Sequence, residues 1–171
     1  YDGVEFAGYF GNSAADVKKE LDKLGLVSVG THNMFDNPGT YKENLEFEKE
    51  LNTCGLVVPW HTIESEDDVN ALVKKMKELA SYYTPHGFKV GYHNHNQEFK
   101  TFGGKYALDI LFEQVPELIC EIDVYWVKFA GVDPVEYLKK YNGRIPLIHL
   151  KDMEKNNNKK STEIGSGSLD M

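Results

Sequence analysis

Short apolar runs alternate with helix-like segments along this chain, at spacings of roughly 25 to 30 residues. The runs cover residues 4–7, 26–29, 56–60, 88–93, 119–124 and 145–150. Strands that alternate with helices of this length favour parallel pairing through right-handed crossovers. The pattern therefore predicts an α/β fold, built either as an open sheet or as a barrel.

The segments between these runs carry the start and stop signals of helices. Three starts have a capping residue with an acid or a proline close behind it: Ser13 before Asp16, Ser65 before Asp68, and Asp133 before Pro134. Gly25 follows the first apolar helix pattern and is suited to end it.

Polar residues near the ends of the predicted strands favour the barrel. Strands of an open sheet covered on both faces are usually apolar throughout, whereas His, Asp, Glu and Lys alternate with apolar residues here. Inward positions at the carboxyl ends of barrel strands form an active-site floor. Since an eight-stranded (β/α) TIM barrel needs about 250 residues, we expect the 171 residues to form one domain, 1–171. This would be an incomplete barrel of about six βα units that lacks the first and last strands.

Charge and cysteine content exclude several classes of protein. The net charge is -8, and the lysines form no basic stripe, so we expect no nucleic-acid partner. No run approaches the roughly 20 apolar residues of a membrane span, so we expect no membrane partner. Cys54 and Cys120 lie far apart in apolar runs, and we expect both to be buried. The chain enters a strand at once, with no signal peptide or initiating methionine, as if it begins mid-domain. We expect a cytoplasmic location.

The strongest local signal is the segment 91–99, Gly-Tyr-His-Asn-His-Asn-Gln-Glu-Phe. In an extended chain His93 and His95 share one face, and Glu98 follows within reach of the same pocket. Imidazoles and a carboxylate at this spacing suit a metal or proton-transfer site. Hydrogen-bonding residues at a strand end would give the same pattern without such a role.

A second signal is Glu121 with Asp123, which face one way while Cys120, Ile122 and Val124 face the other. Two carboxylates turned into a barrel repel and lose hydration unless a cation or a base offsets them. Glu121 could instead lie low in the barrel, paired with a lysine or arginine. Asp123 is closer to the strand end, where ligands gather.

The third signal is His149 with Lys151, which point together while Ile148 and Leu150 point outward. A single histidine in such a run is often a satisfied core residue. Its predicted height, equal to that of His95 and Asp123 on consecutive strands, favours a metal site made of His95, Asp123 and His149.

Other strand-end residues are candidates for substrate contacts. His32 offers a hydrogen bond to a hydroxyl, and Trp60 offers an apolar face to a sugar ring. Glu163 lies in a Gly- and Ser-containing loop. Asn33 beside His32, Glu5 in the first strand and His61 beside Trp60 are further candidates to line the pocket.

The motifs together resemble the xylose-isomerase-like barrel superfamily, and within it the sugar phosphate isomerase/epimerases. The resemblance rests on the motifs 92–98, Ile122-Asp123 with Trp126, His-Leu-Lys-Asp at 149–152, and Glu-Ile-Gly-Ser-Gly at 163–167. It implies a divalent ion (Mn, Mg, Zn or Co) bound by Glu, Asp, His and Glu. Asp123 and His149 match the second and third ligands. The first ligand is then Glu98, His95 or both, and the fourth lies beyond Met171.

These residues predict a metal-dependent isomerase or epimerase that moves a proton next to the carbonyl of a sugar, sugar phosphate or related polyol. Catalytic roles fall to Glu98, His93 and Lys151, with Lys151 stabilising enediolate charge. Substrate contacts fall to His32, Trp60, Trp126 and Glu163.

Three alternatives stay open. They are a dehydratase or lyase on a keto sugar or inositol-like substrate, an abasic-site endonuclease-like protein, and a barrel that binds sugar without turnover. A homo-oligomer is also compatible with the sequence.

Overall fold

The computed structural model describes residues 1–155 and 159–169. Its main sheet consists of β1 (Gly3–Phe6), β2 (Val27–His32), β3 (Gly55–Val58), β4 (Lys89–His93), β7 (Ile119–Asp123) and β8 (Leu147–His149). The helices are α1 (Ala14–Leu24), α2 (Tyr41–Leu51), α3 (Glu66–Tyr83), α4 (Ala107–Gln114), α5 (Val124–Phe129) and α6 (Pro134–Lys140). Two small hairpins pair β5 (Thr101–Phe102) with β6 (Lys105–Tyr106) and β9 (Asp152–Met153) with β10 (Ser161–Thr162).

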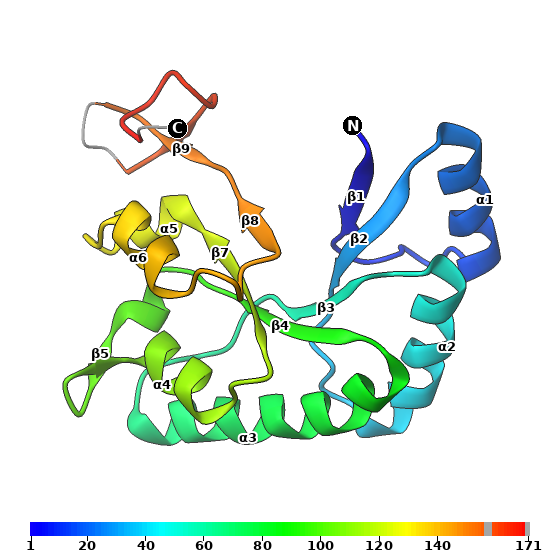
Figure 1. The fold of residues 1–171 in the computed structure, drawn as a ribbon, viewed down its shortest axis with the longest axis horizontal. Helices are drawn as coiled ribbons and strands as arrows, with labels where there is room; N and C mark the ends of the chain where they lie inside the picture. The colour runs from blue at the N-terminus through cyan, green and yellow to red at the C-terminus, as the bar shows by residue number, and fades with distance from the viewer. Residues whose placement is uncertain (156–158, 170–171) are drawn as a thin grey trace.

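The main sheet is parallel throughout, in the order β1-β2-β3-β4-β7-β8. All six predicted strands are therefore present, with ends that differ by at most three residues. Figure 1 shows the sheet curling into a trough, with α1 to α4 arranged along its outer side. The predicted α/β fold and incomplete barrel are confirmed.

Capping explains where the helices begin. The Ser13 side chain accepts a hydrogen bond from the backbone N–H of Asp16, and Ser65 with Asp68 forms a complete capping box. Asp133 caps α6 just before Pro134. Gly25 ends α1 in the left-handed conformation, at φ 67°.

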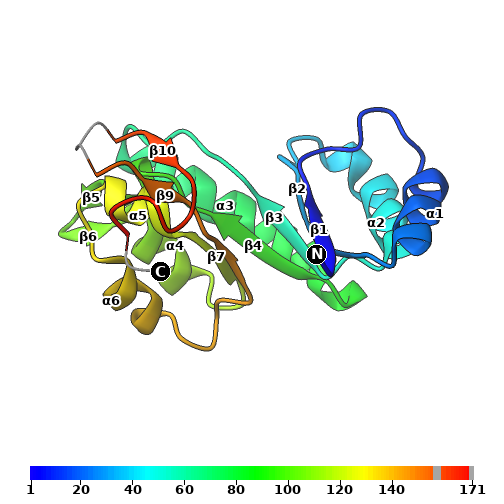
Figure 2. The same cartoon turned by 90° about the horizontal axis from the view of Figure 1, so that it is seen from above.

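The main apolar core lies between the outer face of the sheet and the helices. Cys120 and Ile122 of β7 pack into it with Leu56 of β3 and with the apolar face of α3. A smaller apolar cluster joins α1 and α2 to β1, at the far end of the molecule from α5 and α6 in Figure 2. Because Cys120 and Ile122 point outward, Glu121 and Asp123 point into the trough, as their alternation predicted.

Glycines make room inside the trough. A Cβ atom on Gly30 would lie 2.5 Å from Glu5 Oε1, and one on Gly91 would lie 2.7 Å from Ile119 Cγ1. Leu147 Cδ1 reaches within 3.5 Å of the Cβ position of Gly55. Ile119 and Leu147 thus fill the floor of the trough, one layer below the polar residues.

One predicted position is wrong. Cys120 is buried in the core, but Cys54 is exposed, because it lies at the amino end of β3 where the chain enters the sheet. Within the described ranges, no helix is both long and apolar enough to span a bilayer.

Candidate metal centre

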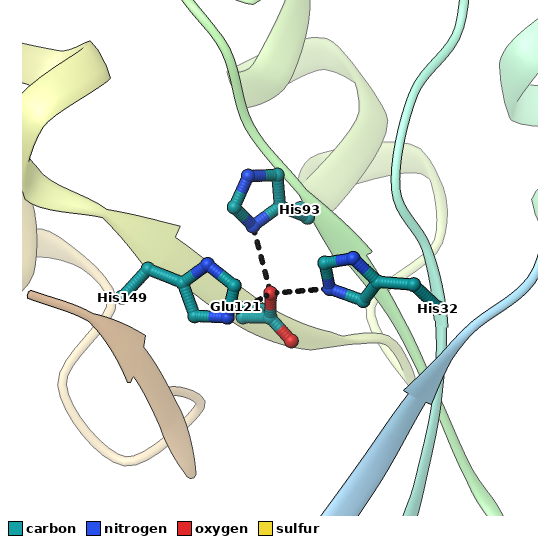
Figure 3. Close-up of side chains that lie close together, drawn as sticks. All are labelled: His32, His93, Glu121 and His149. Atoms are coloured by element: carbon teal, nitrogen blue, oxygen red, sulfur yellow. Dashed lines mark hydrogen bonds and ion pairs between the residues drawn. The ribbon is translucent and has the colours of Figure 1, made fainter. Parts of the chain in front are cut away.

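Three imidazoles converge on one carboxylate oxygen inside the trough. Glu121 Oε1 lies 2.7 Å from His93 Nδ1, 2.8 Å from His32 Nε2 and 3.1 Å from His149 Nε2. One ligand atom from each of these four residues lies within 4.8 Å of the others. Figure 3 shows the three rings surrounding the Glu121 side chain. We call His32, His93, Glu121 and His149 the His–Glu cluster.

The strand register brings the cluster together. His93 is the register partner of Glu121 between β4 and β7, and Asp123 is the partner of His149 between β7 and β8. His32 ends β2, on the other side of β3 from β4. Curling of the sheet then turns these side chains toward one point.

A second carboxylate touches the cluster. Glu5 Oε2 lies 2.6 Å from His149 Nε2 and 3.7 Å from His32 Nε2. Glu5 Oε1 and Glu121 Oε2 are buried and have no hydrogen-bond partner among the residues that the structure describes. Unpaired buried carboxylate oxygens are costly, so the site lacks positive charge that a bound cation would supply.

The pKa shifts agree with a negatively charged pocket. Burial alone would raise the pKa of Glu121, but hydrogen bonds from His32 and His93 outweigh burial and lower it. The pKa of His149 is raised, chiefly by its hydrogen bond to Glu5. Glu121 has no lysine or arginine partner among the described residues, which excludes the pairing considered from the sequence.

The donor set fits a divalent metal. Imidazole nitrogens and a carboxylate oxygen are the usual ligands of borderline ions such as Zn²⁺, and are also compatible with Mn²⁺ and Co²⁺. Three imidazoles make Mg²⁺ a poorer match, since it prefers oxygen ligands. The predicted ligand His149 belongs to this cluster, whereas His95 and Asp123 do not.

Asp123 lies beside the cluster and caps a helix. Its Oδ1 accepts hydrogen bonds from the backbone N–H groups of Tyr125 and Trp126, at 2.9 and 3.2 Å. Its Oδ2 lies 3.9 Å from His93 Nε2. Burial raises the pKa of this carboxyl.

His95 lies above His93, toward the rim of the trough. Its ring is 5.0 Å from that of His93 and 5.2 Å from that of Trp126. Its Nδ1 is buried and has no hydrogen-bond partner within residues 1–155 and 159–169. Burial, with the neighbouring charge of His93, lowers the pKa of His95 to about 4, so its imidazole is neutral at pH 7.

Glu98 is fully buried, and both of its carboxylate oxygens accept hydrogen bonds. Oε1 accepts from the Tyr92 hydroxyl at 2.7 Å, and Oε2 accepts from the backbone N–H of His95 at 2.8 Å. These bonds fix the turn that carries His95.

The remaining predicted site residues lie at different distances from the cluster. Lys151 places its ammonium over the rings of Tyr125 and Trp126. Trp60 is 44% exposed. Glu163 is exposed, and its carboxylate accepts a hydrogen bond from the Thr162 hydroxyl. Among the described residues, no contact joins Trp60 or Glu163 to the cluster.

The sequence analysis gave three residues of the site a smaller role than their positions in the structure indicate. His32 was expected to contact substrate, Glu121 was left between two roles, and Glu5 was only a weak candidate. The two-residue alternation of the strand could have identified Glu121 as a site residue. It lies one inward position below Asp123, at the height of His93.

No protein-family model and no curated protein matches this chain. Several solved structures match it. The chain is 25% identical to a sugar phosphate isomerase/epimerase from Parabacteroides distasonis, with a TM-score of 0.70 over 86% of this chain, and spans only 64% of that protein. A second protein of that description from the same organism is 24% identical, with a TM-score of 0.78 over 92% of this chain and 71% of the other.

An AP endonuclease, family 2, from Brucella melitensis also matches, at 19% identity and a TM-score of 0.68, over 86% of this chain and 67% of the other. Proteins of different activities thus share this fold, and the matches establish the fold rather than a reaction.

Proposed function

We propose that this chain, which has the fold of the xylose-isomerase-like superfamily, is a metal-dependent enzyme that isomerises or epimerises a sugar or related polyol. The observation that carries the proposal is the convergence of three imidazole nitrogens on Glu121 Oε1, next to two buried carboxylate oxygens without partners. Such a site is unfavourable without a cation.

His32, His93, Glu121 and His149 would hold the ion. A divalent ion at this position supplies Lewis-acid chemistry, which makes the C–H beside a substrate carbonyl more acidic. Asp123 lies at the edge of the cluster, near His93 Nε2, and is a further candidate ligand. The metal ligands expected from the sequence were His95, Asp123 and His149. The proposed ligands lie one layer deeper in the trough, and only His149 belongs to both sets.

Proton transfer is assigned to the carboxylates of the pocket. Glu5 Oε1 and Glu121 Oε2 have no hydrogen-bond partner in the described part of the chain, so each is available to take a proton from carbon. Return of the proton to the adjacent carbon gives isomerisation, and return to the opposite face gives epimerisation. Both oxygens of Glu98 are occupied, so its contribution is to position His95.

The groups above the cluster would contact the substrate. His95 is neutral and offers an unpaired nitrogen, and Trp126 offers an apolar face beside it. Lys151 would balance charge that develops on a substrate oxygen. Trp60 and Glu163 remain candidates for substrate contacts at a greater distance, and a cytoplasmic location remains a prediction.

Elimination of a hydroxyl after proton removal would give a dehydratase from the same residues. Abasic-site cleavage is disfavoured, since the net charge of -8 opposes binding of a phosphate backbone.

The proposal is tested by incubating the protein with Mn²⁺ and candidate ketoses in D₂O. We expect one bound ion per chain and incorporation of deuterium at the carbon next to the carbonyl. Metal binding with abasic-site cleavage and no exchange would favour the nuclease. Absence of metal binding would overturn the proposal.

A further inference from the structure

The side chain of Asn94 holds the backbone of Asp123. Its Oδ1 accepts a hydrogen bond from the Asp123 N–H at 3.0 Å, and its Nδ2 donates to the Asp123 carbonyl at 3.4 Å. Both bonds require the same orientation of the carboxamide, with its oxygen toward the N–H and its nitrogen toward the carbonyl. Asn94 is completely buried and Asp123 nearly so, so water does not compete for these bonds.

This contact extends the pairing of β4 with β7 beyond the end of their backbone ladder. The last pair in the register is His93 with Glu121, both of which belong to the His–Glu cluster. Asn94 follows His93 directly, and its carboxamide offers a donor and an acceptor as a peptide group does. Side-chain bonds therefore fix Asp123 relative to His93 where the backbone pairing has ended.

Asp123 lies at a sharp junction between strand and helix. It is the last residue of β7 and the N-cap of α5, which begins at the next residue. Its Oδ1 accepts hydrogen bonds from the N–H groups of Tyr125 and Trp126, while Oδ2 faces His93 Nε2 at 3.9 Å. A shift of the Asp123 backbone would move Oδ2 relative to the cluster, and would move Trp126 relative to the neighbouring ring of His95.

We propose that Asn94 is a positioning residue of the metal centre, which keeps the Asp123 carboxylate directed at His93. A leucine of similar size would fill the same buried space, so shape alone does not account for a carboxamide there. A buried carboxamide is unfavourable unless it is hydrogen-bonded, and the two bonds to Asp123 supply that compensation. The inference rests on the proposed function, since it concerns the same metal site.

The test compares Asn94→Leu with two controls. Asn94→Leu keeps the approximate volume of the side chain and removes both bonds to Asp123. Cys120→Ala removes volume from the core on the outer side of the same strand pair, and controls for lost stability. Asn96→Leu changes an exposed position of the turn that follows β4, and controls for the substitution itself.

The first measurement needs no metal. In the metal-free protein, amide hydrogen exchange followed by NMR should be at least about tenfold faster for Asp123, Tyr125 and Trp126 in Asn94→Leu, beyond the change in global stability. In Cys120→Ala the same amides should exchange faster only by the factor that its global stability accounts for. Unchanged protection of these three amides in Asn94→Leu would overturn the inference.

The second measurement separates positioning from a purely structural role. Calorimetry at a temperature where every variant is folded should show Mn²⁺ affinity roughly 10- to 100-fold lower in Asn94→Leu, and unchanged in both controls. The visible spectrum of the Co²⁺-loaded protein, which depends on the geometry of the ligands, should change in Asn94→Leu alone. Wild-type affinity and an unchanged spectrum in Asn94→Leu would make Asn94 a structural residue and overturn the proposal.

A double variant shows whether Asn94 acts through Asp123. In an Asp123→Ala background, Asn94→Leu should cause little further loss of Mn²⁺ affinity, because the carboxylate that it positions is gone. Losses that add fully would overturn the assignment. Absence of Mn²⁺ binding by the wild-type protein would contradict the proposed function and any role of Asn94 in a metal centre, whereas normal wild-type binding with no effect of Asn94→Leu overturns only the role of Asn94.

Discussion

His149 Nε2 and Glu5 Oε2 lie 2.6 Å apart, although they belong to the two edge strands of the six-stranded sheet. The contact is possible only because the sheet curls until β8 and β1 face each other. It also brings Glu5 into the pocket of Glu121, where each carboxylate has one buried oxygen that no other described residue contacts by a hydrogen bond. The curvature of the fold therefore both assembles the His–Glu cluster and buries these carboxylate oxygens.

Glu121→Gln should weaken Mn²⁺ binding. The variant keeps the shape of the side chain but removes the charge at which the three imidazoles converge. We expect a loss at least as large as the roughly 10- to 100-fold typical of changes beside metal ligands, measured by calorimetry. Glu117→Gln, in the exposed loop before the same strand, is the matched control. Unchanged affinity in Glu121→Gln would remove this residue from the site.

Gly30→Ala should disturb the pocket, whereas Gly55→Ala should be tolerated. The added methyl on Gly30 would lie 2.5 Å from Glu5 Oε1, but on Gly55 it would meet its nearest atoms at an ordinary 3.5 Å. We expect Gly30→Ala to reduce Mn²⁺ affinity and the midpoint of thermal unfolding, and Gly55→Ala to change neither appreciably. Equal behaviour of the two variants would contradict the packing of Glu5 against β2.

His149 should have a raised pKa in the metal-free protein. Its pKa is raised mainly by Glu5. A raised folded-state pKa stabilises the fold fully below about pH 6.5, the unfolded value, and this contribution disappears as the pH rises through the folded-state pKa. Glu5→Gln should lower the His149 pKa in an NMR titration. An unshifted His149 resonance in that variant would show that another group sets its pKa.

Asp152 should make the loop after β8 sensitive to acid. It is fully buried, and its oxygens accept hydrogen bonds from the backbone N–H groups of Met153, Gly165, Gly167 and Leu169. Burial opposes ionisation, but these bonds outweigh it and lower the pKa of Asp152. The stabilisation is therefore present above the unfolded pKa of about 3.9 and is lost as the pH falls through the lower folded-state value.

Asp152→Asn should lower the unfolding temperature at pH 7, and the difference from the wild-type protein should shrink as the pH approaches 3. Asp2→Asn, at an exposed position near the amino end of the chain, is the control. A constant difference at all pH values would mean that the Asp152 charge does not hold the loop.

The sequence predicted the fold well because local signals and the global architecture agree. Each strand is a short apolar run, each of three helices begins at a capping residue, and alternation along β7 separates the core residues from Glu121 and Asp123. The small hairpins β5–β6 and β9–β10 were not predicted, since two-residue strands carry no periodic signal.

The site was harder to predict because its position along the strands depends on the stagger between neighbouring strands. His95, Asp123 and His149 were expected at one height, and the register does pair Asp123 with His149. The His149 imidazole, however, lies 3.1 Å from Oε1 of Glu121, the register partner of His93 one inward step deeper. Stagger between strands of a barrel is set by closure of the whole sheet, which no single segment encodes. His149 and Glu5 lie 144 positions apart in the chain, so no local sequence pattern predicts their contact.

Anomalous diffraction from crystals soaked with Mn²⁺ tests the central claim most directly. The account predicts one strong peak within coordination distance of His32 Nε2, His93 Nδ1, His149 Nε2 and a carboxylate oxygen of Glu121, and loss of that peak in Glu121→Gln. A peak elsewhere in the molecule, or none at all in the wild-type protein, would contradict it.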